Sequence, residues 1–368
     1  MTNFMARPDG KIFMAGFLIM ILSFFNLLFI SDEAFLSSYA FKQFLWMIVA
    51  AVIFFVVSRL RLQTIKKVSV PFYLLSIFTL VFVLIVGEEI SGAKSWIRIA
   101  GFISFQPSEL VKISLIFIIA KFYSDLGAYS KSYLIKYVLG LAFFALPFVL
   151  IMLQPDLGSA LMLLGISLSV IISFSFNKSI FLSILLIIVA LSVPVWNYGL
   201  KDYQKERITS FIYPENDPSG YGYNVIQSKV AIGSGKFFGK GLGNSSQGKL
   251  KFLPEKHTDF AFSVWAEQTG FLGSMIIIGL YSFIVIYSLL FLNKIRDSFL
   301  QVLLFGLSSY FFLHLLINIS MTIGLFPVVG IPLLMFSYGG SSLICGAVSL
   351  SLMALIISEY RDVNRLGL

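Results

Sequence analysis

Single carboxylates stand at the edges of the hydrophobic runs of this chain, where a polar segment meets an apolar one. Asp259, Glu109 and Asp156 are the clearest cases. A charge inside hydrocarbon costs free energy, from about 2.5 kcal/mol upward at the centre of a membrane helix, so such a residue usually has a function. A carboxylate that stays ionised at a boundary between water and an apolar interior can accept a hydroxyl proton. The pattern therefore indicates chemistry at a membrane surface.

Asp259 is the strongest candidate for a base. It stands at the first turn of a long apolar run, where a helix N-terminus stabilises an anion although burial acts in the opposite direction. The alternative is an ordinary acid at a helix start. His257 beside it can titrate, form a hydrogen bond or do neither. Glu267, eight residues further on, is expected on roughly the same face as a second polar contact.

Two other acids each have a structural and a functional interpretation. Glu109 and Lys112 are spaced i, i+3 and share a helix face. They form either an ion pair that admits two charges into the membrane or a polar site within the helix bundle. Asp156, in the segment QPDLG, either caps the helix that starts at Leu157 or contacts a substrate.

The elements that must hold these residues are membrane-spanning helices. The 368 residues are 58% hydrophobic and only 12% charged, whereas a soluble domain carries roughly 25% charged residues. The apolar runs are continuous, which predicts one all-α, polytopic membrane domain and argues against a β-barrel. We expect about ten spans, with eight as the alternative if 136–176 is a broken hairpin. They lie near 12–31, 40–58, 68–87, 108–123, 136–153, 157–176, 179–196, 260–292, 298–320 and 341–359.

Lys and Arg residues gather at alternate ends of the expected spans. One set of ends includes Arg59, Arg61, Lys66 and Lys67, whereas the short loops at the other ends hold few basic residues. The positive-inside rule therefore places both termini in the cytoplasm. The net charge of +9 does not indicate nucleic-acid binding, because this distribution suits membrane topology and lipid phosphates better. The single cysteine, Cys345, excludes an internal disulfide.

Three unusual segments fall on the opposite, outer side. Residues 88–107 are too polar to span and too apolar for an ordinary loop, so we expect a surface-lying or re-entrant piece with Trp96 as an interface anchor. The extracytoplasmic loop 197–258 holds nine Lys and Arg against five Asp and Glu. It is either solvated coil or an element that binds a phosphate-bearing partner. Residues 318–342 contain two prolines and four glycines, and such backbone at membrane depth must be buried or line a cavity.

Five separated blocks carry a recognisable pattern. They are GAKSWI (92–97), FQPSELVK (105–112), QPDLGSA (154–160), LPEKHTDFAFSVWAEQTG (253–270), and the stretch from Asn318 through Gly324-Leu325, Pro327 and Gly330 to Ser337–Ser342. Together, and in this order, they resemble the SEDS family, the group of RodA, FtsW and SpoVE. The resemblance covers essentially the whole chain. The HTDF block looks more like the elongation branch (RodA) than the division branch (FtsW), and Gln268 stands where the family often has a second Glu.

The resemblance implies a peptidoglycan glycosyltransferase of the bacterial cytoplasmic membrane. Such an enzyme polymerises lipid II on the outer face, here for cell elongation and rod shape, beside a class B penicillin-binding protein that crosslinks the strands. It implies ten spans, Asp259 as the essential carboxylate, and Glu109 and Lys112 close to it in one cavity. A divalent cation, Mg²⁺ or Mn²⁺, is implied by the resemblance alone.

This activity would be a single inverting displacement. It needs a base for the sugar hydroxyl, for which Asp259 is the candidate, and cations to neutralise the departing pyrophosphate. The cation candidates are Lys112, Arg207 and Lys256, and the candidates for the cavity wall are Trp96, Ser337, Gly339, Gly340 and Ser341. A lipid II flippase and a non-catalytic scaffold are the alternatives. The grouping of polar residues at one side, rather than at mid-bilayer, favours an enzyme over a transporter.

Overall fold

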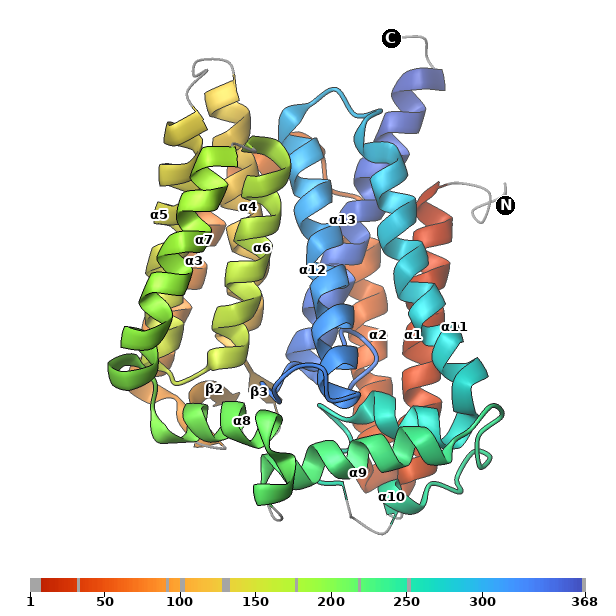
Figure 1. Ribbon diagram of the computed structural model, residues 1–368. Helices are drawn as coiled ribbons and strands as arrows, with labels where there is room; N and C mark the ends of the chain where they lie inside the picture. The colour runs from red at the N-terminus through yellow and green to blue at the C-terminus, as the bar shows by residue number, and fades with distance from the viewer. Residues whose placement is uncertain are drawn as a thin grey trace.

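The computed structural model describes residues 8–31, 34–90, 93–99, 103–127, 133–175, 178–217, 220–249 and 253–365. Within these residues, ten long helices run along a common direction (Figure 1). They are α1 (Pro8–Ile30), α2 (Tyr39–Val57), α3 (Leu62–Val86), α4 (Pro107–Gly127), α5 (Tyr133–Leu153), α6 (Leu157–Ser175), α7 (Lys178–Pro194), α11 (Ala261–Leu292), α12 (Ser298–Thr322) and α13 (Gly340–Arg365). Each coincides with an expected span, and α5 and α6 are two complete helices rather than a broken hairpin.

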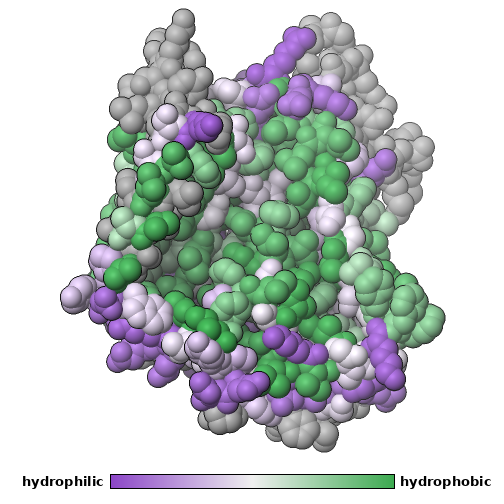
Figure 2. Space-filling model, viewed as in Figure 1, coloured by the Kyte–Doolittle hydropathy of each residue, from purple (hydrophilic) through white to green (hydrophobic). Residues whose placement is uncertain are grey.

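The helices have the composition of membrane spans. Seven of those described are long and apolar enough to cross a bilayer: α1, α2, α3, α6, α11, α12 and α13. Large apolar side chains remain exposed on their outer faces, for example Phe55 at 58% and Ile85 at 72%. Figure 2 shows hydrophobic residues across the middle of the face in view and hydrophilic residues along its lower edge. The chain is therefore an all-α, multi-pass membrane protein.

The core forms where α4, α12 and α13 pack together. Helix α4 contacts α3, α12 and α13, and its side chains from Val111 to Ala120 are almost all fully buried. Gly306 of α12 lets α4 approach closely, because an added Cβ would lie 2.5 Å from the Ile116 side chain. Small residues commonly allow such close helix contacts in membranes. This packing brings the charged residues of α4 against the polar residues of α12.

The polar segments gather at one end of the bundle, opposite the end where both termini lie (Figure 1). Helices α8 (Asp202–Ile212), α9 (Tyr221–Ser234) and α10 (Ser246–Lys249) lie at this end. Three short strands accompany them: β1 (Glu88–Ile90), β2 (Ala93–Ile99) and β3 (Ile103–Phe105). Where it is described, the long loop after α7 is thus mostly helical rather than coil.

The strands correct the re-entrant alternative for residues 88–107, whereas the alternative of a surface-lying piece agrees with their position at the polar end of the bundle (Figure 1). They form an antiparallel sheet in the order β1-β2-β3, with Trp96 opposite Glu88 and Ile97 opposite Phe105. Only Ile97-Arg98-Ile99 of this segment alternates between apolar and polar residues, which is too short a run to indicate a strand. The mixed composition of the segment therefore did not distinguish strands from a piece that lies at the membrane surface.

Helix α11 is broken at Gly270, which explains its unusual length of 32 residues. Gly270 has φ 68° and ψ −159°, and an added Cβ would lie 2.3 Å from the backbone nitrogen of Gly239. The preceding Gly-rich loop supplies hydrogen bonds at the break: Lys240 N donates to Glu267 O at 3.0 Å, and Phe271 N donates to Lys236 O at 2.9 Å. The long apolar run is therefore two helical pieces joined at a docked loop.

Candidate functional site

Asp259 lies in the turn before α11, not on the helix itself. The turn is closed by Phe260 N, which donates to Glu255 O at 3.2 Å. The side-chain amide of Asn318 in α12 donates to the Asp259 carbonyl at 2.9 Å and to the Ile331 carbonyl at 2.8 Å. One buried amide thereby joins the turn to the irregular segment between α12 and α13. Asp259 and Glu267 consequently do not share a helix face, contrary to our expectation.

The Asp259 carboxylate faces the irregular segment at Gly330. Gly330 has φ 73°, and an added Cβ there would lie 3.5 Å from Asp259 Oδ2. The side chain is half-buried, and no ion pair within 4 Å neutralises it among the residues described. Burial, reinforced by the nearby Glu255 charge, raises the pKa of Asp259 to about 7, although Arg207 and the Thr258 hydroxyl act in the opposite direction. A carboxyl group with a pKa near neutrality is suited to proton transfer at physiological pH.

His257 forms the other wall of this turn. Its carbonyl accepts a hydrogen bond from Tyr338 N at 2.8 Å, and its ring lies 4.4 Å from that of Tyr39. Burial, together with the positive charge of Lys256, lowers the pKa of His257 to about 4. His257 is therefore neutral at pH 7 and does not serve as a counter-ion for Asp259.

Glu109 and Lys112 form a buried ion pair. Lys112 Nζ lies 2.6 Å from Glu109 Oε1, and the two side chains are 2% and 3% exposed. The Tyr310 hydroxyl donates to the other carboxylate oxygen at 3.1 Å. Lys112 is thus committed to Glu109 and does not present a free cation to a ligand. An ion pair that neutralises two charges inside the bundle therefore accounts for both residues.

Polar residues on one face of α12 connect this ion pair to the Asp259 turn. Tyr310, His314 and Asn318 are spaced i, i+4, i+8 and therefore follow one another along the helix. The rings of Tyr310 and His314 are 4.7 Å apart, and His314 Nδ1 lies 2.9 Å from the Pro332 carbonyl. All three side chains are fully buried. We had used Asn318 only as part of a family motif, and the i, i+4, i+8 spacing in an apolar helix was the signal that would have revealed the row.

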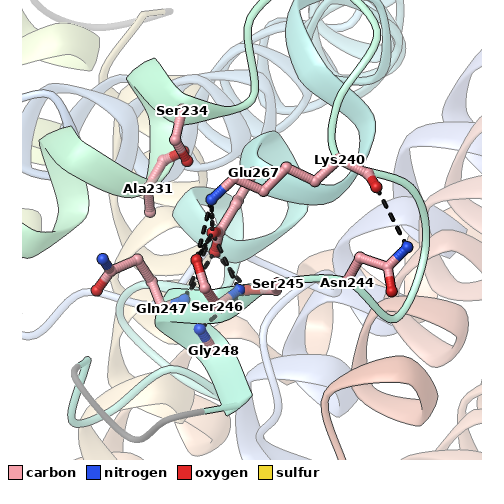
Figure 3. A network of polar contacts seen from close by, with 9 residues as sticks. All are labelled: Ala231, Ser234, Lys240, Asn244, Ser245, Ser246, Gln247, Gly248 and Glu267. Carbon is pink, nitrogen blue, oxygen red and sulfur yellow. Dashed lines mark hydrogen bonds and ion pairs between the residues drawn. The ribbon is translucent and has the colours of Figure 1, made fainter.

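Glu267 differs from Asp259 in having every carboxylate oxygen engaged, as Figure 3 shows. Its Oε1 lies 2.6 Å from Lys240 Nζ and 2.8 Å from Ser246 Oγ, and it also accepts from Ser246 N at 3.1 Å. Its Oε2 accepts from Ser245 Oγ and, at 3.2 Å, from Gln247 N. Glu267 is fully buried and fixes the segment 240–249 to α11. It therefore acts as a structural anchor.

The contacts of the Gln268 side chain explain why this position holds Gln where the family often has a second Glu. Its carbonyl oxygen accepts from Gly243 N at 3.0 Å, while its amide group donates to Asn26 Oδ1 at 3.3 Å. A side-chain amide both donates and accepts hydrogen bonds, whereas an ionised carboxylate only accepts them. A Glu at this position would therefore lose the bond to Asn26.

Asp156 caps α6. Its Oδ1 accepts from Ser159 N at 2.9 Å, which is the geometry of an N-cap, and its Oδ2 accepts from the Gln106 side chain at 3.1 Å. Gln106 N in turn donates to Ser341 Oγ at 3.1 Å. Three blocks that lie far apart in the sequence therefore meet at the N-terminal ends of α4, α6 and α13.

The remaining candidates are placed as follows. Ser337 Oγ accepts from Leu333 N at 2.9 Å, and Gly340 packs so closely on the Trp46 indole that an added Cβ would lie 2.4 Å from it. At Gly339 an added Cβ would be in ordinary contact, 3.7 Å from Ser342 Cβ. Trp96 lies half-buried on β2.

Two of the candidate cations, Lys256 and Arg207, lie in the long loop, and their surroundings differ. Lys256 Nζ donates to the carbonyl oxygen of Gly248, so it holds the loop together. Arg207, on α8, stacks on Tyr221 at 4.7 Å and stabilises the ionised form of Asp259 by its charge. Of the three expected cations, Arg207 is the one whose charge lowers the pKa of Asp259.

The described residues supply no cluster of three His, Cys, Asp or Glu side chains that could hold a metal ion. The fully engaged Glu267 and the paired Glu109 offer no coordination sites. The expected divalent cation therefore has no cage of protein ligands in the part of the chain that is described.

The chain matches known proteins along most of its length. The family of cell cycle proteins named for FtsW, RodA and SpoVE matches residues 10–362. The chain is 36% identical over 274 residues to the peptidoglycan glycosyltransferase MrdB of Escherichia coli K12, which is 74% of this chain and 73% of the relative. It is 35% identical over 318 residues to a probable peptidoglycan glycosyltransferase FtsW of Trichlorobacter lovleyi, covering 85% and 81% of the two chains.

Two solved structures share the fold. A chain from a peptidoglycan synthase complex, described as coordinating polymerization and crosslinking, superposes with a TM-score of 0.79 at 27% identity, covering 96% of this chain and 97% of that one. The rod shape determining protein RodA of Thermus thermophilus superposes with a TM-score of 0.70 at 26% identity, covering 96% of each chain.

Proposed function

Because the chain belongs to the FtsW/RodA/SpoVE family of cell cycle proteins, we propose that it is a peptidoglycan glycosyltransferase in which Asp259 is the general base. The observation that carries the assignment of the base is the state of its carboxylate. Asp259 has no neutralising partner among the described residues, and its pKa is raised to about 7, while Glu109 and Glu267 are fully engaged in internal contacts. Of these three buried or half-buried acids, Asp259 is thereby the one left for chemistry.

The reaction joins the sugar of a lipid pyrophosphate donor to a 4-hydroxyl of an acceptor sugar. We propose lipid II as the substrate. Asp259 accepts the hydroxyl proton as the oxygen attacks the anomeric carbon, the bond to the pyrophosphate breaks, and the configuration inverts without a covalent enzyme intermediate. A placed base typically contributes about 10²–10⁴-fold in rate. Asn318 holds the backbone of the base in position through the Asp259 carbonyl.

Arg207 is the residue best placed to attract the leaving pyrophosphate, because Lys112 and Lys256 are occupied by Glu109 and the Gly248 carbonyl. Magnesium is commonly held by one or two carboxylates together with substrate phosphates. Binding of a divalent cation would therefore depend on the phosphates of the substrate.

The decisive experiment compares lipid II polymerisation by purified Asp259→Asn protein with that by Asp297→Asn protein. Asp297 caps α12 at the opposite end of the bundle, so its substitution controls for the loss of one acid. We expect the glycan product of Asp259→Asn to fall at least about 100-fold, and that of Asp297→Asn to stay near normal. Near-normal glycan chains from Asp259→Asn would refute the base. Labelled lipid II that crosses a vesicle membrane without polymerising would favour a flippase.

We also propose that the end bearing α8–α10 faces outward from the bacterial cytoplasmic membrane and that both termini are cytoplasmic. Tyr198 and Lys294 are exposed and follow the C-terminal ends of α7 and α11, and these two helix ends lie at opposite ends of the bundle (Figure 1). A membrane-impermeant maleimide should label Tyr198→Cys but not Lys294→Cys in intact cells. The reverse pattern would invert the topology.

A crosslinking enzyme is the expected partner. The similar chain from a peptidoglycan synthase complex supports a class B penicillin-binding protein as that partner. Glycan synthesis by the purified protein should rise when this transpeptidase is added, and an unchanged rate together with no co-purification would contradict the proposal.

A further inference from the structure

A cavity of about 420 Å³ opens between α8, the short 3-10 helix η4 (Pro214–Asn216) and the start of α9. It lies at the polar end of the bundle, outside the membrane-spanning helices. Its volume falls in the range of roughly 300–1,000 Å³ that small-ligand sites occupy. None of the residues assigned to catalysis lines it, so it is separate from the Asp259 turn.

Internal hydrogen bonds hold the wall of the cavity in place. Its floor is Asp217, whose carboxylate accepts hydrogen bonds from Ser210 Oγ at 2.8 Å, Gly220 N at 2.9 Å and Gly222 N at 3.0 Å. Gly222 packs against the Pro214 carbonyl, where an added Cβ would lie 2.4 Å away. These contacts fix α9 against the turn, so a ligand would meet a preformed site.

The lining combines two tyrosines with exposed polar groups. Tyr213 is 63% exposed, and Tyr221 is half-buried. The side chains of Glu206 and Asn216 are exposed, so their polar groups are accessible to a ligand. Aromatic rings offer flat apolar faces, and carboxylate and amide groups offer acceptors and donors for hydroxyl groups. The C–H face of a pyranose ring and its equatorial hydroxyls match this combination.

The charge of the lining excludes the phosphate end of the substrate. Glu206 and Asp217 are the ionisable carboxylates of the cavity, and no Lys or Arg lines it. A pyrophosphate would be repelled, whereas an uncharged sugar with hydroxyl donors would not. The lining therefore selects the glycan portion.

Arg207 contacts the wall of the cavity. Tyr221, which lines the cavity, accepts a hydrogen bond from Arg207 Nη2 at 3.2 Å. The cavity and the proposed pyrophosphate-binding residue therefore share helix α8.

We propose that this cavity is a binding site for the β-1,4-linked amino-sugar backbone of the growing glycan strand, with Tyr213 and Tyr221 against its sugar rings and Glu206 and Asn216 on its hydroxyls. The identity of the ligand as product strand rests on the proposed function. The site itself, a subsite for β-1,4-linked N-acetylhexosamines, does not depend on polymerisation.

The test is binding of chitohexaose, a neutral β-1,4-linked chain of N-acetylglucosamine, to the full-length protein in lipid nanodiscs by saturation-transfer NMR and titration. Maltohexaose serves as the control sugar. We expect Tyr213→Ala and Glu206→Gln each to weaken chitohexaose binding by about tenfold, as loss of an aromatic or charged hydrogen-bonding contact does. Tyr213→Phe should retain binding, because its ring is intact, which shows that the loss is not one of folding.

Matched controls lie outside the cavity. Tyr198 is 92% exposed and Glu215 is exposed, and neither lines the site, so Tyr198→Ala and Glu215→Gln should bind normally. Equal weakening by Tyr198→Ala and Tyr213→Ala, or binding of maltohexaose as tight as that of chitohexaose, would overturn the site.

Asp259→Asn separates this proposal from the enzymatic one, because it should abolish polymerisation but keep chitohexaose binding. Binding that persists in a protein with no polymerase activity in any form would refute the enzyme and leave the sugar site. In active protein, Tyr213→Ala should shorten the glycan chains. Weak chitohexaose binding combined with chains of normal length would refute the product strand as the ligand.

Discussion

Two carboxylates eight residues apart, Asp259 and Glu267, occupy opposite environments. Glu267 is fully buried, yet Lys240, two serine hydroxyls and two backbone amides surround it. Asp259 keeps some exposure but has no such set of donors, and its pKa rises to about 7. The difference teaches that depth of burial does not identify a reactive acid. The number of donors that satisfy the acid does, because each donor stabilises the charged form.

The strongest test of this comparison replaces each acid by its amide and measures both activity and stability. Asp259→Asn should remove activity by at least about 100-fold and leave folding intact, whereas Glu267→Gln should lower stability by about 2 kcal/mol or more, because Lys240 and several donors lose their charged partner. Polymerisation assays and thermal unfolding in detergent measure the two effects. If Glu267→Gln has the unfolding temperature of the parent protein but is inactive, the distinction between a structural anchor and a base is wrong.

The pKa of Asp259 adds a pH test to the same pair. Since its folded pKa is raised to about 7 from an ordinary 3.8, the folded protein binds more protons than the unfolded chain between these values, and stability falls as pH rises through this window. Asp259→Asn removes this effect. The variant should therefore unfold at a higher temperature than the parent at pH 8, and at nearly the same temperature at pH 4. A lower unfolding temperature at pH 8 would contradict the raised pKa.

The ion pair of α4 extends the comparison to a third acid. Lys112→Met leaves Glu109 buried without its counter-charge, which should destabilise the protein by about 3–5 kcal/mol. The double variant Glu109→Gln/Lys112→Met removes both charges and should recover most of that loss. Thermal unfolding of both single variants and the double variant forms the cycle. Failure of the double variant to recover would show that the pair has a role beyond mutual neutralisation.

Two charges near Asp259 should move its titration in opposite directions. Arg207→Gln removes an attraction, so it should raise the pH at which polymerisation reaches half its maximum, by roughly 0.5 unit. Glu255→Gln removes a repulsion and should lower that pH by a similar amount. Rates of lipid II consumption between pH 5.5 and 8.5 measure both shifts. Two variants that move the midpoint in the same direction would contradict Asp259 as the group that titrates.

The sequence predicted features that depend on neighbouring residues, but not contacts between residues that lie far apart along the chain. The ten helices and the Glu109–Lys112 pair were predictable, because hydrophobic run length and i, i+3 spacing are local signals. The partners that distinguish the acids are not local. Lys240 lies 27 residues from Glu267, Asn318 lies 59 from Asp259, and Tyr310 lies 201 from Glu109. The sequence identified the acids, but only tertiary packing determined which of them was satisfied.

The helices at the polar end were missed for a related reason. Helix α8 is short and amphipathic, with four charged residues among eleven, and we interpreted its composition as possible coil. An isolated helix of this length is marginal in water, so its stability must come from contacts with α9 and η4 that the sequence does not display. The sugar cavity, which depends on those contacts, was therefore not predictable from composition.

The smallest effect is expected at Asp156, where our two interpretations, a helix cap and a substrate contact, make different predictions. Asn accepts a hydrogen bond at an N-cap about as well as Asp, so Asp156→Asn should retain both stability and glycan synthesis, whereas Asp156→Ala should lose about 1 kcal/mol because Ser159 N loses its acceptor. The Gln106 amide that donates to Oδ2 can still bond to the Asn carbonyl or to solvent. Unfolding temperatures together with polymerisation rates measure both properties. If Asp156→Asn folds normally but loses activity, its charge contacts the substrate, and Asp156 would then join Asp259 as an acid with a function that its internal partners do not satisfy.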